Sequence, residues 1–159
     1  MHQQAAGRNV SKMGFPRRES ATGRMLDNYL RAKGKGWDLD DETLHMLFAA
    51  NRWESALDLV SRLENGQDVV LDRFAFSGIA YSVAKGLDPR WCRTWEHGLP
   101  APDLVLFLDV KPEAAAQRPG YGQERYERIE FQTRVRAAFC ELQQASLVES
   151  ANGPGPCPW

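Results

Sequence analysis

The 159-residue sequence lacks the features that mark secreted, disulfide-bonded and membrane-spanning proteins. It has three cysteines, which form neither a Cys-x-x-Cys pair nor a ligand spacing with histidine. No apolar run approaches the roughly 18 residues of a membrane helix, and the N-terminus has no apolar signal segment. We therefore expect reduced thiols at Cys92, Cys140 and Cys157 and a location in the cytoplasm, with the nucleus and the mitochondrion as alternatives.

An excess of charge of one sign is also missing, because the formal net charge is −1. A chain without overall basicity is not expected to bind nucleic acid or an anionic membrane surface. Any phosphate that it binds must be held by arginines gathered at one place. The hydrophobic content of 43% is enough for the core of one domain and argues against a disordered chain.

A phosphate-binding loop is the third absence. The motif GxxxxGK[ST], whose backbone amides and lysine cradle nucleotide phosphates, occurs nowhere in the sequence. Residues 33–36, with the sequence KGKG, have neither its spacing nor a preceding strand, so we expect a flexible loop there.

Two apolar runs end in acidic residues, as buried parallel strands do where they open into a ligand crevice. The first covers Val69–Arg73 and the second Leu104–Val110, with an aspartate near the end of each. The carboxylate of Asp72 is able to hold a metal directly or through water, and Arg73 is able to grip a phosphate. The alternative is a surface ion pair at a strand end.

The helical spacing of apolar residues predicts the remaining elements. Expected helices cover residues 22–30, 41–64, 75–84, 89–96, 112–117 and 124–144. Because helices alternate with buried strands, the predicted class is α/β with a parallel sheet and right-handed crossovers. We expect residues 1–14 to be a disordered leader, residues 15–148 to form one partial domain and residues 149–159 to be a disordered tail.

Several separate segments resemble, in order, the motifs of the thymidylate kinase family, the dTMP kinase branch of the P-loop nucleoside monophosphate kinases. They are residues 15–18 (FPRR), 47–54 (LFAANRWE), 72–78 (DRFAFSG), 104–108 (LVLFL) and 124–127 (ERYE). The resemblance covers about residues 15–139 and implies a three-layer P-loop NTPase-type parallel sheet. That sheet is expected to be incomplete here, because the family's central first strand and phosphate loop have no counterpart in the sequence.

The resemblance also implies a binding site for dTMP. Two arginines would hold the acceptor phosphate, an aromatic ring would stack on thymine, an arginine would donate to the carbonyl edge of the base, and a tyrosine would lie beside the deoxyribose. In that order these are Arg18 and Arg73, Phe48, Arg52 and Tyr81, with Phe15, Ser77, Gly78 and Tyr126 as further substrate-binding residues. The residues alone leave alternatives open, namely a core position for Phe48, an acidic partner for Arg52, ordinary packing for Tyr81 and a solvated Arg18.

For catalysis, the resemblance implies ATP as co-substrate, Mg²⁺ as cofactor and a homodimer. The catalytic residues would be Asp72, Arg73 and Arg118, with Asp72 holding the Mg²⁺, directly or through water, and Arg118 on a mobile lid. The expected reaction converts dTMP and ATP to dTDP and ADP in dTTP biosynthesis.

Without the phosphate loop, the sequence keeps the dTMP-acceptor half of such a site, so we expect a fragment or a shortened product. The alternative function is that of a truncated, catalytically inactive dTMP-binding or interaction protein. A monophosphate kinase with another base preference is disfavoured by the combination of Phe48, Arg52 and Tyr81.

Overall fold

The computed structural model describes residues 7–32 and 38–151, without the side chains of residues 145–151. The loop expected at residues 33–36 and most of the expected tail, residues 152–159, lie outside the described part. Residues 149–151 belong to the last helix, so the prediction of a disordered tail is wrong for them.

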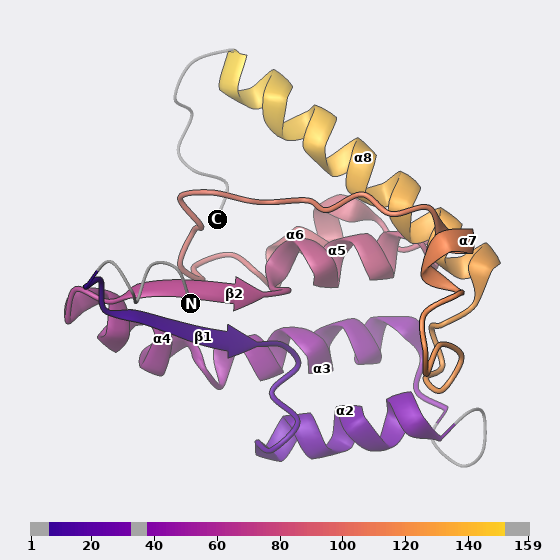
Figure 1. Ribbon diagram of the computed structural model, residues 1–159, viewed down its shortest axis with the longest axis horizontal. Helices are drawn as coiled ribbons and strands as arrows, with labels where there is room; N and C mark the ends of the chain where they lie inside the picture. Colours follow the sequence, from indigo (N-terminus) through magenta and orange to yellow (C-terminus); the bar gives the residue numbers. More distant parts are fainter. Residues whose placement is uncertain (1–6, 33–37, 152–159) are drawn as a thin grey trace.

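A parallel pair of strands forms the sheet (Figure 1). Strand β1, Val10–Gly14, pairs with β2, Asp68–Asp72, and the ladder continues one step further where the Phe15 amide donates to the Asp72 carbonyl over 3.0 Å. The prediction of a disordered leader is therefore wrong for residues 10–14. The polar composition hid this strand, because its order comes from hydrogen bonds to β2 and from burial of Met13 rather than from local apolar periodicity.

Seven helices accompany the two strands in the described residues. They are α2 (Ala21–Arg31), α3 (Asp41–Trp53), α4 (Ala56–Glu64), α5 (Ala75–Val83), α6 (Pro89–Thr94), α7 (Pro112–Ala115) and α8 (Ile129–Ala151). The side chains of Ser20, Asp40 and Asp88 cap α2, α3 and α6 by accepting a backbone N–H in the first turn. These elements and the parallel pair confirm the α/β class.

Two predicted helices differ from the structure by more than two residues at one end or are divided. The helix expected over residues 41–64 is divided into α3 and α4 at Glu54 and Ser55. The helix expected from residue 124 begins only at Ile129, since the preceding residues form a turn in which the Glu124 amide donates to the carboxylate of Glu127 over 3.0 Å.

The second predicted strand, Leu104–Val110, is wrong. The segment has no regular secondary structure, and Leu104, Leu106 and Leu108 are 75%, 78% and 84% exposed. In Figure 1 it runs as an irregular trace between β2 and α8. A strand needs a hydrogen-bonding neighbour, and in the described residues the sheet consists of β1 and β2 alone, so this apolar run has no ladder to join.

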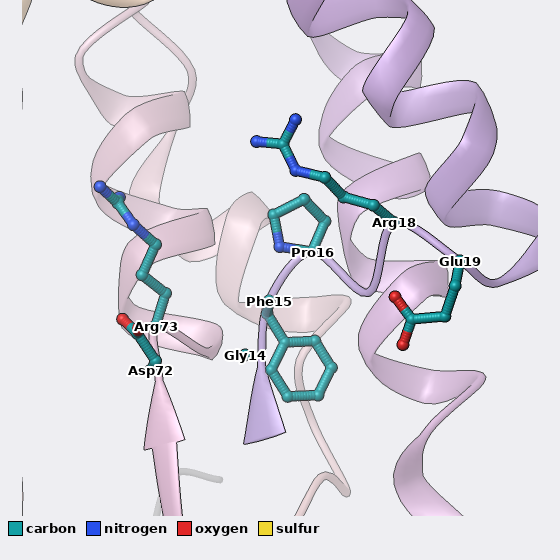
Figure 2. Close-up of a pocket in the computed structure, with 7 residues that line it drawn as sticks. All are labelled: Gly14, Phe15, Pro16, Arg18, Glu19, Asp72 and Arg73. Atoms are coloured by element: carbon teal, nitrogen blue, oxygen red, sulfur yellow. The ribbon is translucent and has the colours of Figure 1, made fainter. Parts of the chain in front are cut away.

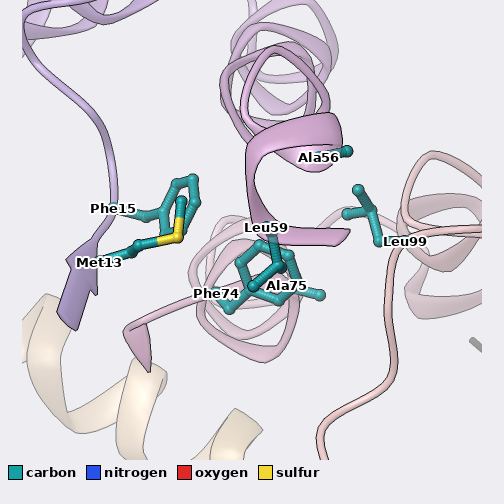
Figure 3. Close-up of a cluster of buried hydrophobic side chains, with 7 residues drawn as sticks. All are labelled: Met13, Phe15, Ala56, Leu59, Phe74, Ala75 and Leu99. Carbon is teal, nitrogen blue, oxygen red and sulfur yellow. The ribbon is translucent and has the colours of Figure 1, made fainter. Parts of the chain in front are cut away.

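Two main clusters of buried side chains fix the elements around the sheet. The first lies between the strands and α4, and Figure 3 shows its members, Met13, Phe15, Ala56, Leu59, Phe74, Ala75 and Leu99. The second joins α5 to α6 and α8 through Ile79, Ala80, Cys92, Ala138 and Leu142. Helix α5 is thereby held in place immediately after β2. No helix in the described part of the chain is long and apolar enough to cross a membrane.

A histidine lies at the centre of the helical layer. The Nε2 atom of His45 is 3.0 Å from the Cys92 carbonyl, which can only accept, so Nε2 carries the hydrogen and Nδ1 accepts from the Ser82 hydroxyl over 2.7 Å. Burial lowers the pKa of His45 below its usual 6.5, an effect opposed by the Cys92 carbonyl and the Glu96 carboxylate and reinforced by the charges of Arg52 and Lys85. The folded protein therefore holds this ring neutral.

The buried histidine predicts a loss of stability on mild acidification. The unfolded chain binds a proton at His45 near pH 6.5 and the folded chain does so only at lower pH, so the free energy of unfolding falls as the pH drops below about 6.5. Urea unfolding followed by circular dichroism between pH 7.5 and 5 checks this. We expect His45→Gln to flatten the slope and the exposed His97→Gln to retain it; an unchanged slope in His45→Gln would contradict the assignment.

Candidate functional site

A pocket lies at the carboxyl ends of β1 and β2, where parallel sheets commonly bind ligands. Its volume is about 360 Å³, and Figure 2 shows the residues that line it, Gly14, Phe15, Pro16, Arg18, Glu19, Asp72 and Arg73. We call it the strand-end pocket. Four of these residues, Phe15, Arg18, Asp72 and Arg73, were predicted as site residues from the sequence, and the fold brings them together from two segments more than fifty residues apart.

Arg73 directs its guanidinium from the end of β2 toward α5. Its φ angle of 64° is in the left-handed region, which costs free energy for any residue with a Cβ and is found more often at functional sites than elsewhere. The guanidinium donates to the Tyr81 hydroxyl over 3.1 Å, with its central carbon 5.3 Å from the centre of that ring. Tyr81 therefore holds one side of the arginine while the rest of it faces the pocket.

Arg18 lies across the pocket from Arg73. In Figure 2 the two side chains extend in the same direction, on either side of Pro16. The Arg18 guanidinium bonds to the carboxylates of Asp27 on α2 and, over 2.6 Å, of Glu124 in the segment after α7. Hydrogen-bonded ion pairs lower the pKa of Asp27, with the larger effect from Arg31 and the smaller from Arg18. This carboxylate is therefore charged at neutral pH. The pocket thus presents two oriented cations to a ligand.

The carboxylates of the pocket fit a magnesium ion that takes most of its coordinating oxygens from bound phosphates and water. Asp72 is exposed, and Lys12 on the neighbouring strand lies 3.2 Å from its carboxylate; Glu19 supplies the other carboxylate of the lining. Within the described ranges, no group of three or more His, Cys, Asp or Glu side chains could hold a metal alone. Mg²⁺ characteristically takes one or two carboxylates together with phosphates and water, which agrees with this set.

The ring of Phe15 belongs to the core although the residue lines the pocket. It is 8% exposed and packs against Phe74, with 5.1 Å between the ring centres (Figure 3). Phe15 therefore fixes the start of the loop that carries Arg18 and limits the depth of the pocket.

Phe48 and Arg52 occupy one face of α3 but do not line the strand-end pocket. Phe48 is half-buried against a cluster that includes Leu26 and Leu44. Arg52 is 3% exposed and makes a two-pronged ion pair with Glu96, which is fully buried in the turn after α6; the Nε–Oε2 distance is 2.7 Å. In the structure, Arg52 has the acidic partner that the sequence left open as an alternative.

The first turn of α5 approaches this ion pair closely. An ideal Cβ on Gly78 would lie 2.5 Å from the Arg52 Nη2 atom, so a side chain at this position would have to displace the guanidinium from its ion pair. Ser77 is half-buried beside it on the same turn. The two residues therefore allow α3 and α5 to pack with an arginine between them.

Tyr81 links Arg73 to the segment after α7. Its ring meets that of Tyr126 edge-on at 5.6 Å, and the Tyr126 hydroxyl donates to that of Tyr29 over 3.4 Å. Burial raises the pKa of Tyr126, which keeps the hydroxyl protonated. Arg118, by contrast, is exposed and lies outside the lining of the pocket. The structure thus brings Glu124 to Arg18 and Tyr126 to Tyr81, and it leaves Arg118 outside the pocket.

Four residues that hold the arginines in place were not predicted. Asp27 and Glu124 bind Arg18, Glu96 binds Arg52, and Asn51, which is 1% exposed, accepts a hydrogen bond of 2.7 Å from the Arg17 amide. Asn51 lies in the LFAANRWE segment, and the resemblance of that segment to a family motif was the signal that could have identified it. The partners of Arg18 and Arg52 are between 9 and 106 residues away in sequence, so nothing local could identify them.

Gly23 determines how tightly the loop before α2 can fold. An added Cβ would overlap the Arg17 carbonyl oxygen and lie 2.6 Å from the Arg17 carbonyl carbon, both backbone atoms that cannot rotate away. Gly23→Ala is therefore expected to displace the loop that carries Arg18 and to lower stability by about 1–3 kcal/mol. Thermal unfolding measures the cost, with Ala21→Gly as a control on the exposed side of α2. Wild-type stability in Gly23→Ala would show that the loop is less tightly packed.

Known proteins resemble the chain over most of its length. The family profile described as Thymidylate kinase matches residues 2–153. Thymidylate kinase of Arabidopsis thaliana is 49% identical over 132 residues, which are 83% of this chain and 49% of that protein. The human thymidylate kinase is 42% identical over 143 residues, 88% of this chain and 65% of that protein. The chain thus spans about half to two thirds of the length of these relatives.

A solved structure gives the same result for the fold. Thymidylate kinase from Candida albicans superposes with a TM-score of 0.79 and 34% sequence identity, over 89% of this chain and 69% of that one. The P-loop kinase fold expected from the sequence is therefore confirmed, with an incomplete sheet in the described residues. By its profile match and its relatives, this chain belongs to the thymidylate kinase family.

Proposed function

We propose that these residues form the dTMP side of a thymidylate kinase active site, which accepts the terminal phosphoryl group of ATP to give dTDP. The observation that carries the proposal is the strand-end pocket, where Arg18 and Arg73 reach the same space from separate segments. The 5′-phosphate of a nucleotide is a compact dianion, and guanidinium pairs bind such groups through charge-assisted hydrogen bonds.

The nucleoside would extend from this pocket toward α3 and α5. Tyr81, held by Arg73, is the proposed neighbour of the deoxyribose, and Phe48 is the proposed stacking surface for thymine. Glu96 uses two of the five N–H groups of Arg52, so the remaining donors are the ones available to a carbonyl of the base. Ser77, Gly78 and Tyr126 complete the proposed set on the side of α5.

Phosphoryl transfer itself depends mainly on positioning and on charge stabilisation. Bound Mg²⁺ would neutralise charge on the transferring phosphates, and Asp72 is the proposed ligand, directly or through water. Arg118, exposed in the segment after α7, is proposed to approach the phosphates when ATP is present. The 159 residues contain no GxxxxGK[ST] motif, so we propose that transfer requires a phosphate-binding loop from outside them.

A second candidate function is binding of dTMP without catalysis, as an inactive dTMP-binding or interaction protein. The acceptor pocket is assembled from described residues alone, which favours binding that is independent of ATP. For the complete enzyme we propose a homodimer in the cytoplasm that does not bind nucleic acid; the exposed faces of α3 and α4 are candidates for the contact between subunits.

Calorimetric titration with dTMP, in the absence of ATP, tests the proposal. We expect saturable binding, and tighter binding than for UMP and AMP. An assay for ADP release with ATP and Mg²⁺ then separates the two functions, since turnover supports the kinase and binding without turnover supports the second candidate. A cooperatively folded chain that binds no dTMP would refute both.

A further inference from the structure

The part of α3 next to Arg52 holds the loop of the strand-end pocket. Residues 15–20 join β1 to α2 and carry Arg18; together with the first two residues of α2, Ala21 and Thr22, they are called the 15–22 loop. Asn51 is almost fully buried and accepts from the Arg17 amide over 2.7 Å; its own amide group lies 3.3 Å from the Arg17 carbonyl. One side chain therefore contacts both backbone polar groups of the residue immediately before Arg18.

The same amide group reaches the beginning of α2. It donates to the hydroxyls of Ser20 and Thr22 over 3.0 and 2.9 Å. Because the Arg17 N–H can only donate, the Asn51 oxygen must face it and the NH₂ group must face the hydroxyls, which fixes the orientation of the side chain. All of its hydrogen-bonding groups are thus used on the loop.

Glu54, one turn further along the chain, holds the other half of the loop. Its carboxylate accepts from the Ala21 amide over 3.2 Å, from the Ser20 hydroxyl over 2.7 Å and from the Thr22 hydroxyl. These hydroxyls in turn accept from Asn51, so the two residues share partners. Hydrogen bonds from Thr22 and then Ser20 lower the pKa of Glu54, which keeps the carboxylate charged at neutral pH.

We infer that Asn51 and Glu54 are positioning residues for the acceptor phosphate: they hold the 15–22 loop so that Arg18 is aimed into the strand-end pocket. The inference rests on the proposed function. Neither side chain lines the pocket, so their effect on a ligand passes through Arg18. Such an effect concerns the phosphate of dTMP and not its nucleoside, and this difference separates positioning from a general loss of folding.

The test measures the dissociation constants of dTMP and thymidine by calorimetry with the full chain. We expect wild type to favour dTMP strongly, and Asn51→Ala to reduce that preference about tenfold by weakening dTMP alone. Glu54→Gln, which keeps an acceptor and loses the charge, should reduce it less. Trp53→Phe is the matched control, because this side chain lies between the two in sequence and donates to the Trp95 carbonyl over 2.8 Å instead.

The preference for dTMP over thymidine is also measured with Arg18→Ala, alone and combined with Asn51→Ala. In that background Asn51→Ala should have no further effect, because the residue through which it acts is gone. A full preference for dTMP in Asn51→Ala would overturn the inference while the proposed function stands; absence of dTMP binding by wild type would overturn the function itself. Equal weakening of dTMP and thymidine, or loss of cooperative unfolding in both Asn51→Ala and Glu54→Gln, would assign the two residues to the core and also overturn the inference.

Discussion

Replacing Arg73 with alanine is expected to weaken dTMP binding about 100-fold. The residue faces the strand-end pocket and offers the guanidinium that Tyr81 holds in place. Hydrogen bonds to charged groups contribute about 1.5–3 kcal/mol each, and two of them to one phosphate account for a loss of this size. Calorimetric titration with dTMP measures the change, and thymidine should bind Arg73→Ala almost as it binds wild type.

The backbone at this position supplies an informative control. Since φ is 64° at Arg73, alanine keeps the backbone cost that the arginine already has and loses only the exposed contact with Tyr81, so the stability of Arg73→Ala should be close to that of wild type. Arg73→Gly removes that cost, and we expect the same loss of binding with stability equal to wild type or higher by up to about 1 kcal/mol. Retention of dTMP affinity in both variants would place the phosphate elsewhere.

The second large effect is expected at the buried ion pair. Arg52→Ala leaves the fully buried carboxylate of Glu96 without its partner, and breaking a buried pair from one side costs about 3–5 kcal/mol. Urea unfolding at pH 7.5 gives the value, and this pH keeps His45 neutral. The solvent-accessible pair of Arg62 and Asp58 on α4 is the matched control, for which Arg62→Ala should leave the stability close to that of wild type.

Removing both charges distinguishes a structural pair from a functional one. Arg52→Met combined with Glu96→Leu fills the site with apolar groups, and its stability is expected within about 1 kcal/mol of wild type. If Arg52 also donates to the base, this double variant folds but loses its preference for dTMP over UMP and AMP. A destabilisation by Arg52→Ala no larger than that of Arg62→Ala would show that Glu96 finds another partner or takes up a proton.

The parts of the fold that the sequence predicted are those with local causes. Asp88 and Pro89 start α6 as expected, and the apolar run at Val69 becomes β2, because capping and burial act over a few residues. Strand pairing is not local. Val10–Gly14 is a strand because β2 lies beside it, and Leu104–Val110 is not one because residues 7–32 and 38–151 offer it no neighbouring strand. Local strand propensity therefore missed the first and wrongly predicted the second.

The candidate site shows the same division. Residues at strand ends were identifiable because charged side chains that directly follow a buried apolar run are typical of ligand sites. Arg73 and Asp72 do line the pocket. The residues that orient them are recognisable only in three dimensions: an asparagine in the last turn of a helix, such as Asn51, looks like any polar surface residue until its 1% exposure is known. Sequence patterns thus identify which residues carry charge at the site, whereas the orientation of those side chains is set by packing and hydrogen bonds in the folded protein.

A phosphate that binds Arg18 would compete with the carboxylates of Asp27 and Glu124 for the same guanidinium. Any dianion that takes this guanidinium must displace or share Asp27 and Glu124, and Glu124 is part of the segment that follows α7. Occupancy of the pocket and release of that segment are therefore linked equilibria, and each changes the other by the same factor. The ion pair of Arg18 with Glu124 therefore connects the segment that carries Arg118 to the proposed site of the acceptor phosphate.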